Sequence, residues 1–155
     1  MILNLPSYEH KIRLNDTGKR EIFDVFRKKY VLLTKEEWVR QHFLHYLIEE
    51  KHYPPMLIAV EKSIRVNRQE KRFDAVTYDQ TGKPLVLMEF KSPDIRLDQK
   101  VMEQAGRYNT ALKVRYLIIS NGLHHYCCEI DYENNRFLFH DQIPEYEGLN
   151  TLKNG

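Results

Sequence analysis

The most constraining feature of the sequence is a short apolar run that ends in charged residues. Residues 85–88 read Leu-Val-Leu-Met, a continuous apolar segment typical of a strand buried on both faces. Glu89, Phe90 and Lys91 follow at once. Because side chains alternate along a strand, Glu89 and Lys91 are predicted to point to the same face. Two opposite charges at the end of a buried strand need partners or a function, so this strand end is the first candidate site.

The segments around this strand predict an α/β fold. Residues 79–84 (Asp-Gln-Thr-Gly-Lys-Pro) have hairpin turn chemistry and follow a strand pattern at 72–78. A helix is expected from about residue 97 to 112, followed by a buried strand at 115–120. Such a crossover helix makes the strands at 85–91 and 115–120 parallel neighbours. The remaining strands are expected at residues 56–66, 124–130 and 136–140. We therefore predict a central mixed sheet flanked by helices.

The first helix has the clearest boundaries. Thr34 is a good N-cap, and Glu37 three residues later completes a capping-box pattern. An apolar stripe at helical spacing follows, and residues 53–55 (Tyr-Pro-Pro) end the helix. Glu37 and Gln41 share one face. Two interpretations of Glu37 stay open: it either caps the helix or is an acid that reaches a metal site. Glu36, at the same helix start, is a competing candidate for the metal-site acid.

Length and composition suggest one compact unit. A chain of 155 residues is long enough for its own core, so we expect a single domain with a core of about 30–145. Residues 1–30 would be an N-terminal extension and residues 146–155 a loose tail. The net charge of only +2 means that a nucleic-acid partner would need a local basic patch. Without a leader pattern or an apolar run of ~20 residues, we expect a soluble cytoplasmic protein with no membrane contact.

The cysteines give no sign of a disulfide or a zinc site. Cys127 and Cys128 are adjacent, and the short ring that would join them is strained. His124 and His125 lie close by, but no second ligand pair has suitable spacing. We expect strand thiols in a reducing compartment, packed on opposite faces of the strand.

Asp74 extends the candidate site to a second strand. It lies fifteen residues before Glu89, on the adjoining strand pattern. If the two strands are neighbours, both carboxylates can hold Mg²⁺, which prefers one or two carboxylates, and the carbonyl of Phe90 is a third candidate ligand. A bound dication neutralises charge on a phosphodiester, and Lys91 can orient the attacking water or stabilise the transition state. The alternative is a surface salt bridge between Glu89 and Lys91, with Asp74 merely solvated.

The second helix and several basic residues give weaker signals. Gln104 and Tyr108 are four apart and therefore share a helix face. Glutamine can orient a water or a phosphate oxygen, and tyrosine can stack on nucleic acid, although an ordinary half-exposed face is the alternative. Basic residues that could neutralise phosphates, or could simply be solvated charges, are Arg65, Arg68, Lys71, Arg72, Lys100 and Arg107.

In order and spacing, these motifs resemble the PD-(D/E)xK nuclease superfamily. They are more closely similar to the N-terminal nuclease domain of type I restriction enzyme R (restriction) subunits, over about residues 30–145. The resemblance rests on residues 36–41 (Glu-Glu-Trp-Val-Arg-Gln), 72–74 (Arg-Phe-Asp), 89–93 (Glu-Phe-Lys-Ser-Pro), Gln104 with Tyr108-Asn109, and 120–122 (Ser-Asn-Gly). One departure is Phe73, which stands where the superfamily has a proline.

This resemblance implies a restriction-endonuclease-like core and Mg²⁺-dependent DNA cleavage, with Mn²⁺ as a substitute. The implied roles are metal ligands for Asp74 and Glu89, the catalytic lysine for Lys91, the helix acid for Glu37, and the family's Gln-x-x-x-Tyr pair for Gln104 and Tyr108. The sequence has no Gly-x-x-x-x-Gly-Lys-[Ser/Thr] phosphate loop, so we do not expect it to translocate DNA by itself. Separate motor, methyltransferase or specificity subunits are then candidate partners besides DNA.

Two further functional hypotheses remain open from the sequence. The first is a non-catalytic module on the same fold that binds DNA or a protein. The second is an RNA-processing or repair nuclease, which keeps the chemistry and changes the substrate.

Overall fold

The structure, a computed structural model, describes residues 2–66, 68–108 and 112–149. Over these residues the chain forms a small antiparallel sheet in the order β1-β2-β3 and a larger sheet in the order β4-β5-β6-β7-β8-β9. The strands are β1 Ile12–Leu14, β2 Arg20–Asp24, β3 Lys29–Leu32, β4 Ile58–Val66, β5 Gln69–Tyr78, β6 Pro84–Phe90, β7 Tyr116–Ser120, β8 His125–Asp131 and β9 Arg136–His140. The helices are α1 Lys35–Lys51 and α2 Gln99–Tyr108, with 3-10 turns η1 Pro55–Leu57 and η3 Tyr146–Gly148.

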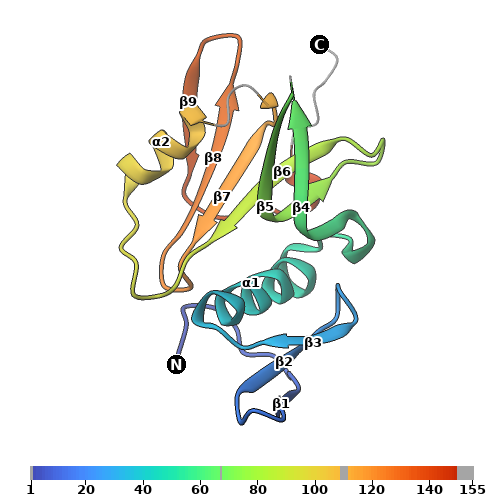
Figure 1. The fold of residues 1–155 in the computed structure, drawn as a ribbon. Helices are drawn as coiled ribbons and strands as arrows, with labels where there is room; N and C mark the ends of the chain where they lie inside the picture. The colour runs from blue at the N-terminus through green and yellow to red at the C-terminus, as the bar shows by residue number, and fades with distance from the viewer. Residues whose placement is uncertain (1, 67, 109–111, 150–155) are drawn as a thin grey trace.

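The larger sheet is mixed, as the sequence predicted. Strands β6 and β7 are parallel, with Val86 opposite Tyr116 and Phe90 opposite Ser120. Every other neighbouring pair in this sheet is antiparallel. The chain passes from β6 to β7 through α2, and β5 joins β6 by the hairpin predicted from residues 79–84. Figure 1 shows these strands as one twisted sheet.

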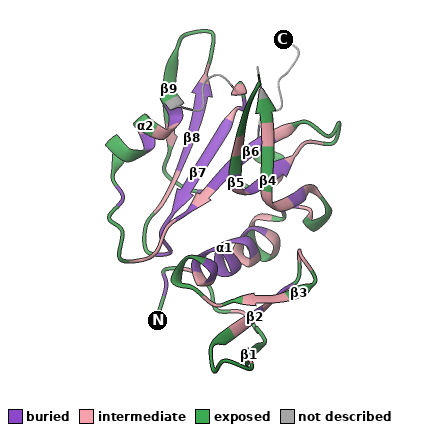
Figure 2. Ribbon diagram, viewed as in Figure 1, coloured by how far each residue is buried: buried purple, intermediate pink, exposed green. Residues whose placement is uncertain are grey.

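Helices α1 and α2 cover opposite faces of the large sheet. On one face Phe43, Leu44 and Leu47 of α1 pack with Met88 and other sheet residues in one buried cluster. On the other face Met102 of α2 belongs to a second buried cluster. The sheet members of this second cluster are Phe73, Val76, Leu87, Leu117, Ile119, Cys128 and Ile130. Figure 2 shows the resulting band of buried residues along β6, β7 and β8. Burial on both faces explains why residues 85–88 are continuously apolar.

The N-terminal residues attach to the rest of the chain in two ways. Residues near the N-terminus form an extended arm, in which the N–H of Asn4 donates to the carbonyl of Gly122 at 2.8 Å. The small sheet follows, and in Figure 1 α1 lies between it and the large sheet. Because Leu3 belongs to the same buried cluster as α1, the arm is part of the core packing.

Several boundaries differ from the sequence expectation. The strand expected over residues 72–78 begins three residues earlier, at Gln69. The strand expected from residue 56 begins at Ile58, because the prolines at 54 and 55 start a 3-10 turn after α1. The helix expected over 97–112 begins at Gln99 and is described to Tyr108, while residues 109–111 lie outside the described residues. Residues 146–149 were expected in a loose tail, but Leu149 is buried in the core and the Tyr146 hydroxyl donates to the carbonyl of Tyr78 at 3.0 Å. Apolar contacts therefore hold this segment; residues 150–155 lie outside the described residues.

The predicted opposite packing of the two cysteines is confirmed. Cys127 belongs to the buried cluster on the α1 face and Cys128 to the cluster on the α2 face, and both are free thiols. None of the helices in the described part of the chain is long and apolar enough to cross a membrane.

Candidate active site

The candidate site lies where β5 and β6 separate. Their ladder begins at the pair Ala75–Met88 and runs toward the 79–84 hairpin. Just beyond it, the Asp74 carboxylate reaches across the strands, and Oδ2 accepts the backbone N–H of Phe90 at 2.6 Å. The acceptor of the Phe90 N–H is thus the side-chain carboxylate of Asp74 and not a backbone carbonyl of β5. This hydrogen bond fixes the Asp74 carboxylate at the end of β6, beside Glu89.

The surroundings of Asp74 disfavour the charged form of its carboxyl group. Burial raises its pKa, and the nearby carboxylates of Glu89 and Glu61 raise it further. The Phe90 N–H and the Arg40 guanidinium act in the opposite direction and lower this pKa. The net direction is upward, because burial is the largest contribution and outweighs the hydrogen bond from Phe90 and the charge of Arg40. A cation at this position would offset the mutual repulsion of Asp74 and Glu89.

Glu89 and Lys91 are both half-buried at the end of β6. The Glu89 carboxylate lies 3.9 Å from the Nζ of Lys71, a residue of β5. The backbone N–H of Lys91 donates to the carbonyl of Ser120 at 2.9 Å, which continues the β6–β7 ladder. The described part of the chain contains no Glu89–Lys91 ion pair, so the salt bridge that was the alternative to a site is not formed.

A cleft opens beside Asp74 on the side of α1. Its volume is about 280 Å³, and Asp74 and Phe90 form part of its wall. The other lining residues are Arg27, Val31, Leu32, Thr34, Glu36, Glu37, Arg40 and Glu61. The cleft thus joins Asp74 and Phe90 to the first turn of α1, where the sequence placed a helix acid, whereas Glu89 and Lys91 are not among its lining residues.

Glu37 occupies the core of an ion-pair network. Thr34 caps the helix, and its Oγ1 accepts the N–H of Glu37 at 3.0 Å. The Glu37 side chain does not return this bond; instead it accepts from Arg27 at 2.8 Å, from Gln41 at 2.9 Å and from both Nε and Nη2 of Arg40. Only half of the capping box is therefore present. Glu37 is buried, with 6% exposed, whereas Glu36 is exposed, so Glu37 is the acid that the fold places inside.

Arg40 connects this network to Asp74. Its Nη1 donates to Glu61 at 2.8 Å and to the backbone carbonyl of Asp74 at 3.3 Å. Glu61 also accepts from Arg72 at 2.8 Å, and its backbone has a φ of 52°, which is unusual for a residue other than glycine. Arg27, which binds Glu37, also pairs with the buried Asp24 of β2. Alternating charges therefore link the small sheet, α1, β4 and β5.

The sequence analysis missed Arg40 and Glu61. Arg40 carried a signal, because it follows Glu37 by three residues and so lies on the same side of the helix. Glu61 carried no such signal. Its partner Arg40 is distant in sequence and its partner Arg72 lies on the next strand, so no local spacing relates the three residues.

Of the predicted pair on α2, Gln104 is not among the residues that line this cleft. Gln104 is exposed, and the described residues include no hydrogen bond from its side chain to Asp74, Glu89 or Lys91. Tyr108 is the last residue of α2, and its side chain lies outside the described residues.

The residues present suit a hard dication of the Mg²⁺ type. Among the described residues, no three or more His, Cys, Asp or Glu side chains cluster as a metal-binding group. Mg²⁺ needs fewer protein ligands, since it keeps several waters and takes one or two carboxylates. Asp74 and Glu89, with the Phe90 carbonyl, match that requirement in chemistry, and burial is the main cause of the raised pKa of Asp74. Glu37 does not join this set, because both of its oxygens already accept hydrogen bonds from arginine.

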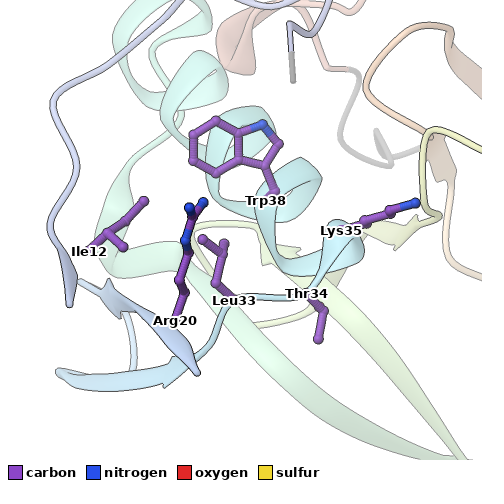
Figure 3. Close-up of a pocket in the computed structure, with 6 residues that line it drawn as sticks. All are labelled: Ile12, Arg20, Leu33, Thr34, Lys35 and Trp38. Atoms are coloured by element: carbon purple, nitrogen blue, oxygen red, sulfur yellow. The ribbon is translucent and has the colours of Figure 1, made fainter. Parts of the chain in front are cut away.

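A second cavity of about 280 Å³ lies at the other side of the α1 N-terminus. Figure 3 shows Arg20 pointing toward Trp38, beside Ile12 and Leu33, while Lys35 points away from them. Lys35 pairs with Asp94 at 2.6 Å. The lining residues of this cavity include none of the predicted site residues and no carboxylate, so we do not assign the metal site to it.

The fold and site define an α/β domain with a restriction-endonuclease-like core, as predicted. Residues 35–144 match the family described as Type I restriction enzyme R protein N terminus (HSDR_N), and the chain belongs to this family. The match agrees with the range of about 30–145 over which the sequence resembled it.

One solved structure supports the same fold. A fragment assigned to the HsdR subunit of a type I restriction enzyme from Vibrio vulnificus YJ016 has 18% identity and a TM-score of 0.52, covering 76% of this chain and 24% of that one. A cryoEM structure of a DrdV–DNA complex has 15% identity and a TM-score of 0.44, covering 75% of this chain and 11% of that one. This chain thus spans about a quarter or less of the length of both. Comparison with curated proteins gives no match.

Proposed function

We propose that this domain is a PD-(D/E)xK-type endonuclease that hydrolyses DNA phosphodiester bonds with a divalent cation, Mg²⁺ or its substitute Mn²⁺. It would be the nuclease part of a cytoplasmic type I restriction system. Motor, methyltransferase or specificity functions would come from other parts of such a system, since the matched family describes only the N-terminal part of the R protein.

One observation carries this proposal. The Asp74 carboxylate is locked onto the N–H of Phe90 at 2.6 Å, which holds it next to Glu89 although both are negative. A structural role would not favour this arrangement, because a buried carboxylate beside another is unfavourable unless a cation or proton compensates. A dication would compensate it, and the adjoining cleft, which Asp74 and Phe90 line, would give a phosphate access to the ion.

The roles of this chain's own residues follow from their positions. Asp74 and Glu89 would hold the ion, with the Phe90 carbonyl as a third ligand. When bound, a dication supplies charge neutralisation at the scissile phosphate and a more acidic water. Lys91, which alternation places on the same face as Glu89, would orient the attacking water or stabilise charge in the transition state. Glu37 supports the site indirectly by fixing Arg40, which contacts the Asp74 carbonyl.

The test combines metal affinity with cleavage. Mn²⁺ binding by calorimetry and Mg²⁺-dependent nicking of plasmid DNA would be measured for the wild type and for Asp74→Asn, Glu89→Gln and Lys91→Ala. The matched control is Asp94→Asn, which removes an exposed carboxylate outside the cleft. We expect the first two variants to lose both Mn²⁺ affinity and nicking, and Lys91→Ala to lose nicking while keeping Mn²⁺ affinity.

Cleavage by folded Asp74→Asn at the wild-type rate would reject the assigned site. A wild type with neither carboxylate-linked Mn²⁺ affinity nor nicking would instead favour a non-catalytic binding module on this fold. Preferential cleavage of RNA would keep the site and change the substrate.

A further inference from the structure

The hairpin between β4 and β5 extends past the candidate site as a separate ribbon. Residues 69–73 of β5 pair with β4, from Gln69 opposite Val66 to Phe73 opposite Lys62. The ladder between β5 and β6 begins only at Ala75. We call residues 61–66 and 68–73 the basic ribbon. It starts next to Asp74, so its strands lead directly away from the proposed catalytic centre.

Positive charge is concentrated in this ribbon. It contains five Lys or Arg residues against two Glu, a net charge of +3, whereas the whole chain carries +2, so the rest of the chain carries −1. The side chains of Lys62, Arg65 and Arg68 are exposed, and Arg72 is 66% exposed. The excess positive charge of the ribbon therefore lies on an accessible surface and not in the buried ion-pair network around Glu37.

The partners of these residues leave the ribbon positive overall. Arg72 pairs with Glu61, and Arg65 lies opposite Glu70 across the strands. Lys62 lies opposite the apolar Phe73, and Arg68 sits at the turn with a φ of 70°. The described residues include no ion pair of Lys62 or Arg68. The surplus charge is thus carried by the outer part of the ribbon.

We propose that the basic ribbon is the surface that holds duplex DNA beside the cleavage site, through contacts to the phosphate backbone. The proposal rests on the proposed function, because it assigns the DNA-contacting element of that same site. Phosphate contacts from Lys and Arg supply most sequence-independent affinity for DNA. Such contacts position the duplex without reading its sequence.

The shape of the ribbon favours B-form DNA over duplex RNA. A two-stranded β-ribbon fits the major groove of B-DNA, which is about 12 Å wide. The major groove of A-form RNA is too narrow and deep for side chains to read. At ~3.4 Å per residue, the five residues from Asp74 to Gln69 span about 17 Å. This reach corresponds to about five base pairs at 3.4 Å each, so the ribbon contacts the duplex adjacent to the phosphate that is cut.

The experiment measures how the affinity for a 30-base-pair duplex depends on salt. The full chain is titrated by fluorescence anisotropy in Ca²⁺, at several salt concentrations, as the wild type and as Arg65→Gln with Arg68→Gln. The matched control is Lys19→Gln with Lys29→Gln, which removes two exposed cations from the small-sheet region. Circular dichroism and thermal unfolding confirm that all variants fold.

We expect the ribbon variant to reduce the slope of log K against log salt by about 1.8, because each phosphate contact contributes about 0.9. Its affinity at 0.1 M salt should fall about eightfold for each phosphate that is no longer neutralised, which follows from the same slope. The control variant should keep the wild-type slope.

Equal losses in the two double variants would overturn the proposal, since they would reflect net charge alone. A wild type with no salt-dependent DNA binding, or with equal affinity for duplex RNA, would overturn it as well. Neither result bears on Mn²⁺ binding by Asp74 and Glu89, so failure of the ribbon proposal is distinguishable from failure of the metal site.

Discussion

Replacing Glu37 with alanine separates the two roles that the sequence left open for this residue. In the structure Glu37 accepts hydrogen bonds from three side chains, Arg27, Arg40 and Gln41. Its removal leaves the Arg40 guanidinium, whose side chain is only 8% exposed, without its main partner. Breaking a buried ion pair from one side costs about 3–5 kcal/mol. Arg40 keeps Glu61 and the Asp74 carbonyl, so we expect a loss near the lower end, about 3 kcal/mol.

Urea unfolding followed by the fluorescence of Trp38, the single tryptophan, measures this loss. With a slope of about 2 kcal/mol per molar, the midpoint should fall by about 1.5 M. The matched control is Glu36→Ala, which removes an exposed carboxylate from the same helical turn. Its only expected cost is the interaction with the helix dipole, about 0.5 kcal/mol.

An acid held in place for metal binding would behave differently. Removing an uncompensated carboxylate would leave the midpoint unchanged or raise it, while cleavage would be lost. If Glu37→Ala unfolds within about 0.5 kcal/mol of Glu36→Ala, our account of the network is refuted.

The backbone, the site and the thiols each allow one further prediction. Gly122→Ala should destabilise the fold by about 2 kcal/mol or more in thermal unfolding, because φ is 86° and an added Cβ would lie 2.7 Å from Leu3. Asp74→Asn should raise the free energy of unfolding of the metal-free domain at neutral pH. Because the pKa of Asp74 is raised in the folded state, its contribution to folding stability is present at low pH and is lost as pH rises. The variant should therefore show a flatter dependence of unfolding free energy on pH. Cys127 and Cys128 should react with iodoacetamide slowly in the native state and rapidly in urea, as followed by mass spectrometry, since burial raises both pKa values, that of Cys128 to about 11. The account of Gly122 would be contradicted by an unchanged unfolding curve of Gly122→Ala. That of Asp74 would be contradicted by an unchanged pH slope of Asp74→Asn, and that of the thiols by rapid labelling of the native protein.

Local patterns predicted much of the fold because each strand and helix is marked within its own segment. Thr34 and the prolines at 54 and 55 bracket α1, and the turn residues 79–84 join β5 to β6. The hairpin also predicted that the strands carrying Asp74 and Glu89 are neighbours, and β5 and β6 are paired. The starts of β4 and α2 were less well predicted, because the energies that set element ends are small compared with those of packing.

The orientation of α2 shows what a helical pattern leaves open. The pattern put Gln104 and Tyr108 on one face, but the rotation of the helix about its axis depends on what it packs against. Gly106 lies so close to Phe137 that an added Cβ would be 2.8 Å from the ring. This contact and the burial of Met102 turn another face toward the sheet, and Gln104 is left exposed.

The order of elements and the mixed sheet could both be inferred from the amino-acid sequence. They follow from periodicity, turn chemistry and the crossover rule, all of which act over short stretches of chain. The binding of Glu37 to Arg27, and the reach of Arg40 to Glu61 and Asp74, emerged only from the three-dimensional fold. Such contacts depend on how α1 docks against β4 and the small sheet, and no spacing along the sequence encodes that placement.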